Sequence, residues 1–190
     1  MKQFPLKDAA NSIRSFLQQI GAPVGEDPEL AETGARVAQA FYEELLSGYR
    51  QDPTAILRDA TASNSDALVV LKNVRIFPIC PHHLLPNPGF AHIAYKPAGR
   101  VIGLGALARL LQCFSRRLIL QEELAKRCSE SIVEELNSPW AACVIDAEAL
   151  CLTARGARAE SSRSTIVHVA GEKKDDSLLL QTFWNTIKSH

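Results

Sequence analysis

Hydrophobic residues near the start of the chain recur at the spacing of an amphipathic helix. Four of them form one stripe between residues 11 and 20: Ile13, Phe16, Leu17 and Ile20. A second stripe begins near Asp27-Pro28, with proline at the first helical position, and ends at Gly48. The pattern therefore predicts two helices at the start of the chain, followed by a polar, irregular surface crossing over 51–66.

From residue 67 onward the pattern changes to one typical of strands. Segments 67–79 and 90–96 combine aliphatic residues and tyrosine with partial alternation, and they predict two strands. Strand character returns over 140–155, with a break near Glu148, and again over 163–169. These segments predict a sheet in the second half of the chain.

Helical spacing reappears between and after the predicted strands. Apolar residues over 107–118 and 124–136 predict a helical pair, and those over 177–187 predict a closing helix. Helices that are grouped apart from antiparallel strands indicate a fold of the α+β class.

Length and composition narrow the classes of protein to which the chain can belong. Its 190 residues are typical of a single domain, 1–190. With 21 Lys and Arg against 21 Asp and Glu, the net charge is zero, which argues against a general nucleic-acid binder but leaves a small anionic substrate open. No apolar stretch approaches the ~20 residues of a membrane span, and no secretion signal is visible. The five cysteines then indicate a reducing, cytoplasmic compartment, in which they are free thiols or metal ligands.

The sharpest local feature is the sequence Cys80-Pro81-His82-His83, at the end of a predicted strand and before a proline-rich loop. Cys80 and His83 lie three residues apart in a turn, so both can face one ion. Zinc binds thiolate and imidazole, and a catalytic zinc has three protein ligands and a water. His82 then points away and is free for acid–base chemistry. The third ligand must come from elsewhere, and Cys151, which is expected to end a strand, is the candidate.

A metal site is not the only interpretation of these residues. A polar turn that contains a half-buried thiol has the same sequence. Cys113, Cys128 and Cys143 fall on apolar faces and are expected to be buried core residues. His92, within a strand, is expected to be a structural histidine rather than a ligand.

The segment Cys80-Pro81-His82-His83-Leu84-Leu85-Pro86 resembles the zinc motif of the GTP cyclohydrolase I family. The resemblance covers nearly the whole chain from about Pro28, and further motifs follow in register: 91–95 (Ala-His-Ile-Ala-Tyr), 101–104 (Val-Ile-Gly-Leu), 107–109 (Leu-Ala-Arg), 115–118 (Ser-Arg-Arg-Leu), 120–122 (Leu-Gln-Glu) and 151–156 (Cys-Leu-Thr-Ala-Arg-Gly). Several motifs in order are far more specific than any one of them.

The resemblance implies a tunnelling fold, in which an antiparallel sheet carries a helical pair, over 65–190, with N-terminal helices in 1–50. It also implies a homodecamer with sites at subunit interfaces. Zinc would be held by Cys80, His83 and Cys151, and the open position would hold a hydroxide. In the family this hydroxide attacks C8 of guanine, and the imidazole ring opens.

Roles for single residues are implied by the same resemblance. His82 matches the acid–base histidine beside the metal ligand. Glu122 matches the glutamate that binds N1 and the 2-amino group of guanine, because a carboxylate offers two acceptors to two donors. Gln121 lies beside it among the substrate-binding residues. Arg109 and Arg155 match arginines near the phosphates, where the guanidinium fork binds oxygen atoms in pairs.

The chain also departs from the family pattern at four positions. Pro81 stands in place of a glutamate. Gly105 and Ala106 replace a serine and a lysine that are expected to contact the triphosphate, and Ala149 replaces a histidine two residues before the second zinc cysteine. Alanine cannot move a proton, and each charge-assisted phosphate contact contributes roughly 1.5–3 kcal/mol.

Three functional hypotheses follow. The departures favour a zinc-dependent hydrolase that opens a less phosphorylated or 8-oxo purine, such as 8-oxoguanine or its nucleoside. The first alternative is an ordinary GTP cyclohydrolase I, which makes 7,8-dihydroneopterin triphosphate and formate from GTP, with His168 as a candidate substitute for the missing histidine. The second alternative is a non-catalytic decamer that binds a purine or pterin. In each case the partner is a small molecule, with neither nucleic acid nor membrane involved.

Overall fold

The computed structural model describes residues 6–159 and 161–189, which fall into two units divided between Ser47 and Gly48. The first unit contains two α-helices, which pack against each other, and two short helical turns. Its elements are α1 (Leu6–Gln19), η1 (Pro28–Leu30), α2 (Thr33–Ala40) and η2 (Phe41–Leu45).

The helices predicted for this unit are confirmed in position but not in extent. The first begins at Leu6 rather than at residue 11. The second is divided, because Asp27 caps only the single turn η1, where its Oδ1 accepts a hydrogen bond of 2.9 Å from Glu29 N. Gly34 lets α2 approach α1, since a Cβ at this position would lie 2.5 Å from the carbonyl oxygen of Ala10.

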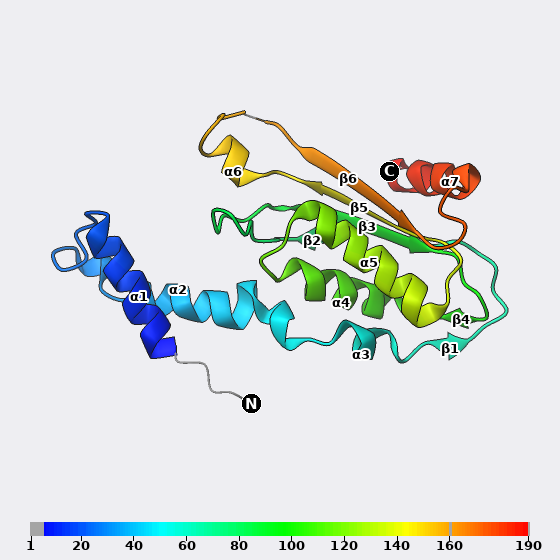
Figure 1. The fold of residues 1–190 in the computed structure, drawn as a ribbon, viewed down its shortest axis with the longest axis horizontal. Helices are drawn as coiled ribbons and strands as arrows, with labels where there is room; N and C mark the ends of the chain where they lie inside the picture. The colour runs from blue at the N-terminus through cyan, green and yellow to red at the C-terminus, as the bar shows by residue number, and fades with distance from the viewer. Residues whose placement is uncertain (1–5, 160, 190) are drawn as a thin grey trace. The chain divides into compact units, whose positions relative to one another are not determined.

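The second unit is built on a four-stranded antiparallel sheet with the strand order β2-β3-β5-β6 (Figure 1). The strands are β2 (Val69–Ile76), β3 (Gly89–Tyr95), β5 (Ala141–Ala147) and β6 (Ser164–Ala170). All four predicted strand segments are therefore confirmed. However, β5 ends at Ala147, so the predicted continuation of this strand to residue 155 is wrong.

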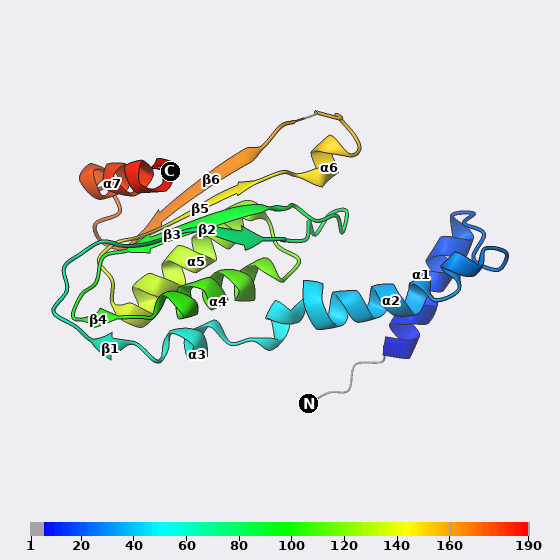
Figure 2. The same ribbon diagram turned by 180° about the vertical axis from the view of Figure 1, so that it is seen from behind.

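Helices cover both faces of this sheet. Ile93 and Tyr95 of β3 belong to the core beneath α4 (Leu104–Ser115) and α5 (Gln121–Leu136), whereas Ala94 packs in a separate core with α7 (Ser177–Lys188). Because successive strand residues point to opposite faces, α7 lies on the face that α4 and α5 do not cover (Figures 1 and 2). The predicted helical pair, the closing helix and the α+β class are confirmed.

The segment before β2 differs from its prediction. It folds into three short elements, of which the last pairs with β4 (Arg100–Val101): η3 (Ser47–Arg50), α3 (Pro53–Leu57) and β1 (Thr61–Ala62). Leu57 is fully buried in the core of the second unit. The segment over 51–66 is therefore mostly exposed, as predicted, but the prediction that it is irregular is wrong for α3 and β1. Few apolar residues in a polar stretch produce no periodicity.

One end of the sheet is called here the Gly89 end, because β2 and β5 finish there and β3 and β6 begin there. It carries four residues that pair in turn across the strands: Ile76, Gly89, Ala147 and Ser164. A side chain at Gly89 would overlap the carbonyl oxygen of Asp146 and the backbone of the next residue, so β3 and β5 can pair here only through glycine. At the opposite end, the Tyr95 end, Tyr95 pairs with Ala141.

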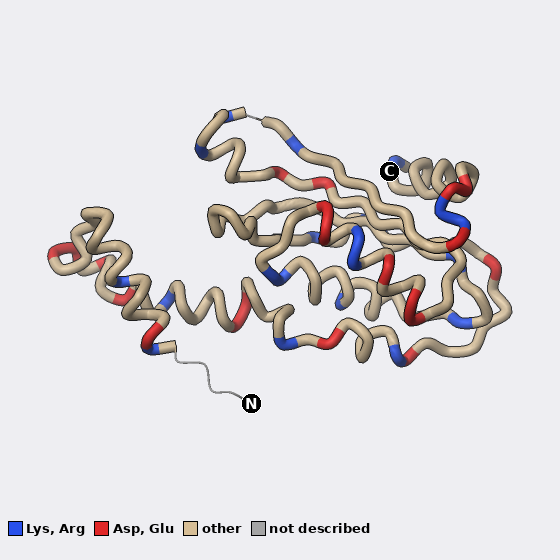
Figure 3. The backbone as a smooth tube through the Cα atoms, viewed as in Figure 1, with Lys and Arg blue, Asp and Glu red and all other residues tan. Residues whose placement is uncertain are grey.

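The net charge of zero is an average over an uneven distribution of charges along the chain. Seven Lys and Arg and no Asp or Glu lie between Asp66 and Glu122, whereas α5 carries both signs (Figure 3). Among the described residues, no helix has both the length and the apolar character needed to cross a membrane.

His92 stabilises an irregularity in the sheet. The pairing of β2 with β3 shifts between Leu71 and Val74, and Asn73 there has a φ of 60°. Asn73 N donates a hydrogen bond of 3.3 Å to His92 Nδ1, and His92 is only 8 % exposed. The expectation of a structural histidine is confirmed. Burial lowers the pKa of His92, nearby Asp146 opposes this shift, and Lys72 adds to it.

This lowered pKa predicts a loss of stability in acid. The unfolded chain takes up the proton first, near pH 6.5, so the free energy of unfolding should decrease as the pH falls below about 6.5 toward the lower pKa of the folded state. His92→Gln keeps an acceptor without a titrating group and should weaken this dependence. Urea unfolding at pH 7.5 and 5.5, with a chelator present, measures both proteins. Equal pH dependence in the two would contradict the assignment.

Candidate metal centre

A tight turn after β2 places Cys80 and His83 on the same side of the chain. Cys80 N donates to Leu85 O and Leu84 N donates to Cys80 O, both at 2.9 Å, and Leu84 has a φ of 55°. The Cys80 Sγ to His83 Nδ1 distance is consequently 3.8 Å. Two donor atoms from positions three residues apart thus face one point, as the spacing predicts.

Cys151 reaches this point from α6 (Leu150–Thr153), not from the end of a strand as expected. After β5 ends, Glu148 N donates to Pro88 O at 3.0 Å, and Thr153 Oγ1 donates to Glu148 Oε1 at 2.9 Å. These bonds hold the short helix beside the loop that follows Cys80.

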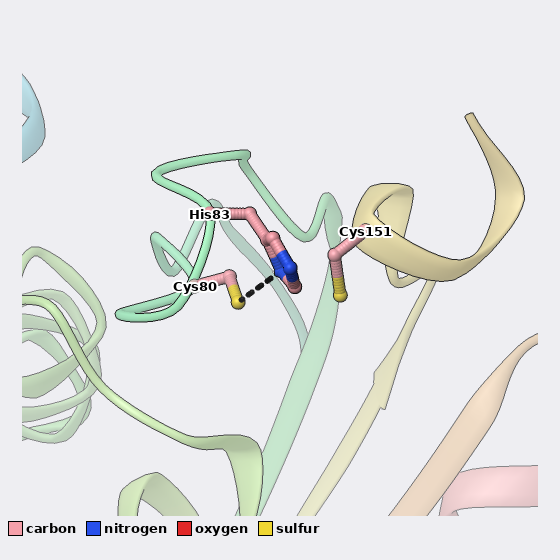
Figure 4. A group of neighbouring side chains, drawn as sticks. All are labelled: Cys80, His83 and Cys151. Carbon is pink, nitrogen blue, oxygen red and sulfur yellow. Dashed lines mark hydrogen bonds between the residues drawn. The ribbon is translucent and has the colours of Figure 1, made fainter. Parts of the chain in front are cut away.

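The three predicted metal ligands converge. The donor atoms of Cys80, His83 and Cys151 all lie within 4.8 Å of one another, and their side chains point toward a common centre (Figure 4). Cys80 is buried, Cys151 is half-buried and His83 is exposed, so the group is open on one side. Two thiols and one imidazole with an open side fit the donor set of a catalytic zinc.

The surroundings of the two sulfur atoms favour a cation between them. Burial, together with the neighbouring Cys80, raises the pKa of the Cys151 thiol above its ordinary value. Two thiolates this close repel each other unless a positive charge lies between them. A bound metal ion would favour the thiolate instead of the thiol, because a coordinated thiol loses its proton.

His82 lies beside this group without belonging to it. Its ring centroid is 6.2 Å from that of His83, at an interplanar angle of 77°, and the side chain is exposed. The imidazole of His82 is therefore accessible to solvent next to the metal ligands.

The start of α5 is attached to the same region. Ile119 N donates to Ile79 O at 3.1 Å, directly before Cys80. Gln121 is buried, and its Oε1 accepts a hydrogen bond of 2.6 Å from Ser164 Oγ at the Gly89 end, while Glu122 is exposed. Both predicted substrate residues thus lie at the end of the sheet that carries the metal ligands. Sequence reasoning missed Ser164, since a serine at the start of a strand carries no distinguishing signal.

Arg155 contacts a metal ligand directly. Its Nη1 is 2.6 Å from His83 Nε2, the ring nitrogen that faces away from Cys80. Sequence reasoning placed Arg155 near phosphates and did not foresee this contact, which depends on how α6 folds back over the loop.

Arg109 is not brought to the metal ligands of its own chain. α4 starts near the Tyr95 end, where Ile102 N donates to Tyr95 Oη at 2.9 Å, and runs toward the Gly89 end for 12 residues, which is about 18 Å. Arg109 lies in the first half of α4, and its guanidinium folds back toward the start of the helix, with Nη1 3.5 Å from the Cβ position of Gly105. Ala106, beside them, is buried.

The remaining candidates lie away from the site. His168 pairs with Cys143 in the middle of the sheet, and its Nδ1 is 2.7 Å from Ser129 Oγ on α5, so the structure does not place it where the histidine missing at Ala149 would act. Cys113, Cys128 and Cys143 are buried free thiols, as predicted.

The convergence of the three donors predicts how metal content responds to substitution. Cys151→Ser replaces a thiolate by a poor ligand and should reduce bound zinc from about one ion per chain to well below one. Cys113→Ala, which removes a buried thiol outside the group, should leave the zinc content unchanged. Elemental analysis after dialysis measures both. Equal zinc in the Cys151→Ser variant and the native protein would contradict the assignment.

Comparisons with known proteins point to one family. A family model described as GTP cyclohydrolase I matches residues 9–188. A protein of Corynebacterium glutamicum named GTP cyclohydrolase 1 is 36% identical over 195 residues, covering 100% of this chain and 97% of the relative. A protein of the same name from Dehalococcoides mccartyi is 38% identical over 157 residues, covering 80% of this chain and 82% of the relative.

Among solved structures, the archaeosine synthase QueF-Like in the apo form aligns with a TM-score of 0.47 and 22% identity, over 57% of this chain and 97% of that chain.

Proposed function

The chain belongs to the GTP cyclohydrolase I family, and we propose that it is a zinc-dependent hydrolase that opens the imidazole ring of a guanine-type purine at C8. The resemblance inferred from the motifs is confirmed by the family model and by relatives that cover the whole chain. The observation that carries the proposal is the group formed by Cys80, His83 and Cys151, with His82 beside its open side.

Each residue of the group has a defined task in this reaction. Cys80, His83 and Cys151 would hold the zinc ion, which would supply an activated water at neutral pH. His82 takes a proton from the attacking water and returns it to the ring nitrogen that leaves C8. Glu122 binds N1 and the 2-amino group of the purine, and Ser164 fixes the Gln121 amide beside it.

The substrate supported best is GTP, with 7,8-dihydroneopterin triphosphate and formate as products. The support is the printed name of the relatives, GTP cyclohydrolase 1, at 36% identity over the full chain. These relatives favour GTP over the less phosphorylated purine that the sequence departures suggest.

A second candidate substrate is a less phosphorylated or 8-oxo purine. Ala106 is buried, Gly105 has no side chain, and Ala149 at the start of α6 makes no side-chain cap, so none of the three offers a side chain that binds phosphate or moves a proton. A non-catalytic binder is less consistent with the site, since binding alone does not require a ligand set with an open position.

The placement of Arg109 supports a site shared between chains. Within one chain Arg109 lies toward the Tyr95 end, whereas the metal ligands lie at the Gly89 end. This separation favours a site in which a second copy supplies the arginine that binds the phosphates. Such a site agrees with the homodecamer that the resemblance implies.

The proposed reaction is tested by incubating the zinc-loaded protein with GTP, GMP, guanosine, guanine and their 8-oxo forms, followed by mass spectrometry and formate analysis. We expect GTP to be consumed with one formate released per molecule. His82→Gln should reduce the rate about 10²–10⁴-fold while the zinc content stays the same. Consumption of the 8-oxo forms alone would select the second candidate. No consumption of any purine would contradict a hydrolase.

The shared site predicts complementation between two inactive variants. Arg109→Ala and His82→Gln should each be inactive alone. Co-assembled in equal amounts, they should regain about a quarter of the native activity, because a site that draws the two residues from different chains is intact at that frequency. If the mixed oligomers stay inactive while both variants assemble normally, Arg109 does not act across an interface.

A further inference from the structure

The two ring nitrogens of His83 face different partners. Nδ1 lies 3.8 Å from Cys80 Sγ, inside the group of metal ligands, and Nε2 lies 2.6 Å from Arg155 Nη1. Figure 4 shows the His83 ring directed between the two sulfur atoms. His83 is thus the point at which the metal ligands and a cationic side chain meet.

The hydrogen bond to Arg155 requires one particular form of the imidazole. A guanidinium has donors only, so Nε2 must be the acceptor and the ring hydrogen must be on Nδ1, the nitrogen that faces Cys80. A metal ion needs the lone pair of Nδ1, which moves the ring hydrogen to Nε2. That N–H then faces the N–H groups of Arg155, and two donors cannot share a hydrogen bond.

Known metal sites have the opposite arrangement around a histidine ligand. The nitrogen that does not bind the metal ordinarily donates its hydrogen to a carboxylate, a carbonyl or a water, and such partners strengthen metal binding. In this chain a donor occupies that place. The hydrogen bond between Arg155 and His83 is therefore incompatible with a metal ion on Nδ1 of His83.

We propose that Arg155 competes with the metal ion for His83, so that metal binding releases the Arg155 guanidinium to bind an anion. Arg155 is exposed and follows α6, and within the described part of the chain its side chain makes one hydrogen bond, to His83. Once released, its planar fork lies beside the metal, where it suits the paired oxygen atoms of a phosphate or sulfate.

This competition makes metal and anion binding cooperative. An anion that holds Arg155 removes the competitor of the metal, and by thermodynamic linkage the metal raises the anion affinity by the same factor. Arg155 affects metal binding through its contact with His83. The inference rests on the metal centre of the proposed function, but it does not depend on the purine or on the reaction.

The test measures metal affinity in the absence of any purine. Cobalt(II), followed by its thiolate absorption in competition with a chelator, is the probe for the native protein, for Arg155→Gln and for Arg158→Gln. Arg158 is an exposed arginine on the same segment, so its variant reports the general effect of removing one positive charge. We expect Arg155→Gln to bind cobalt roughly ten- to hundredfold more tightly than the native protein, and more tightly than Arg158→Gln.

A second arm of the experiment tests the coupling to anions. Sodium sulfate, compared with sodium chloride at equal ionic strength, should tighten cobalt binding severalfold in the native protein and in Arg158→Gln, but not in Arg155→Gln. Weaker or unchanged cobalt binding in Arg155→Gln would overturn the competition, since a supporting residue loses affinity when it is removed. An equal response to sulfate in all three proteins would overturn the coupling. Either failure leaves the purine assay unaffected.

Discussion

The site depends on one geometric constraint, the close pairing of β3 with β5 at the Gly89 end. The loop that carries Cys80 and His83 precedes β3, and α6 with Cys151 follows β5. These segments are distant in the sequence, and they meet where the start of β3 pairs with the end of β5. Glycine at position 89 permits the close approach, and the bond from Glu148 N to Pro88 O fixes it. A larger residue at this point would separate donor atoms that now lie within 4.8 Å.

The same end of the sheet gathers the purine-binding candidates. Ile79 accepts a hydrogen bond from Ile119, so the residue before Cys80 and the start of α5 are held together. Ser164 joins β6 to Gln121. In contrast, α4 begins at the other end of the sheet, which separates Arg109 from the metal ligands within a chain. The guanidinium of Arg155 instead lies beside a metal ligand of the same chain.

Much of this arrangement could be predicted from sequence, where local chemistry is decisive. Strand and helix periods located the sheet and the helical pair, and the spacing of Cys80 and His83 indicated two ligands on one side of a turn. Long-range contacts left no such signal. A polar stretch around Leu57 does not predict α3, and the pattern over 140–155 predicts strand where Cys151 lies in a helix. The contact between Arg155 and His83 joins residues 72 positions apart and depends wholly on the fold.

X-ray absorption spectroscopy of the zinc-loaded protein tests the metal centre most directly. The structure predicts two sulfur ligands at about 2.3 Å and two nitrogen or oxygen ligands at about 2.0–2.1 Å, one from His83 and one from a water. A first shell of four sulfur atoms, or one without sulfur, would contradict an open zinc site on Cys80, His83 and Cys151.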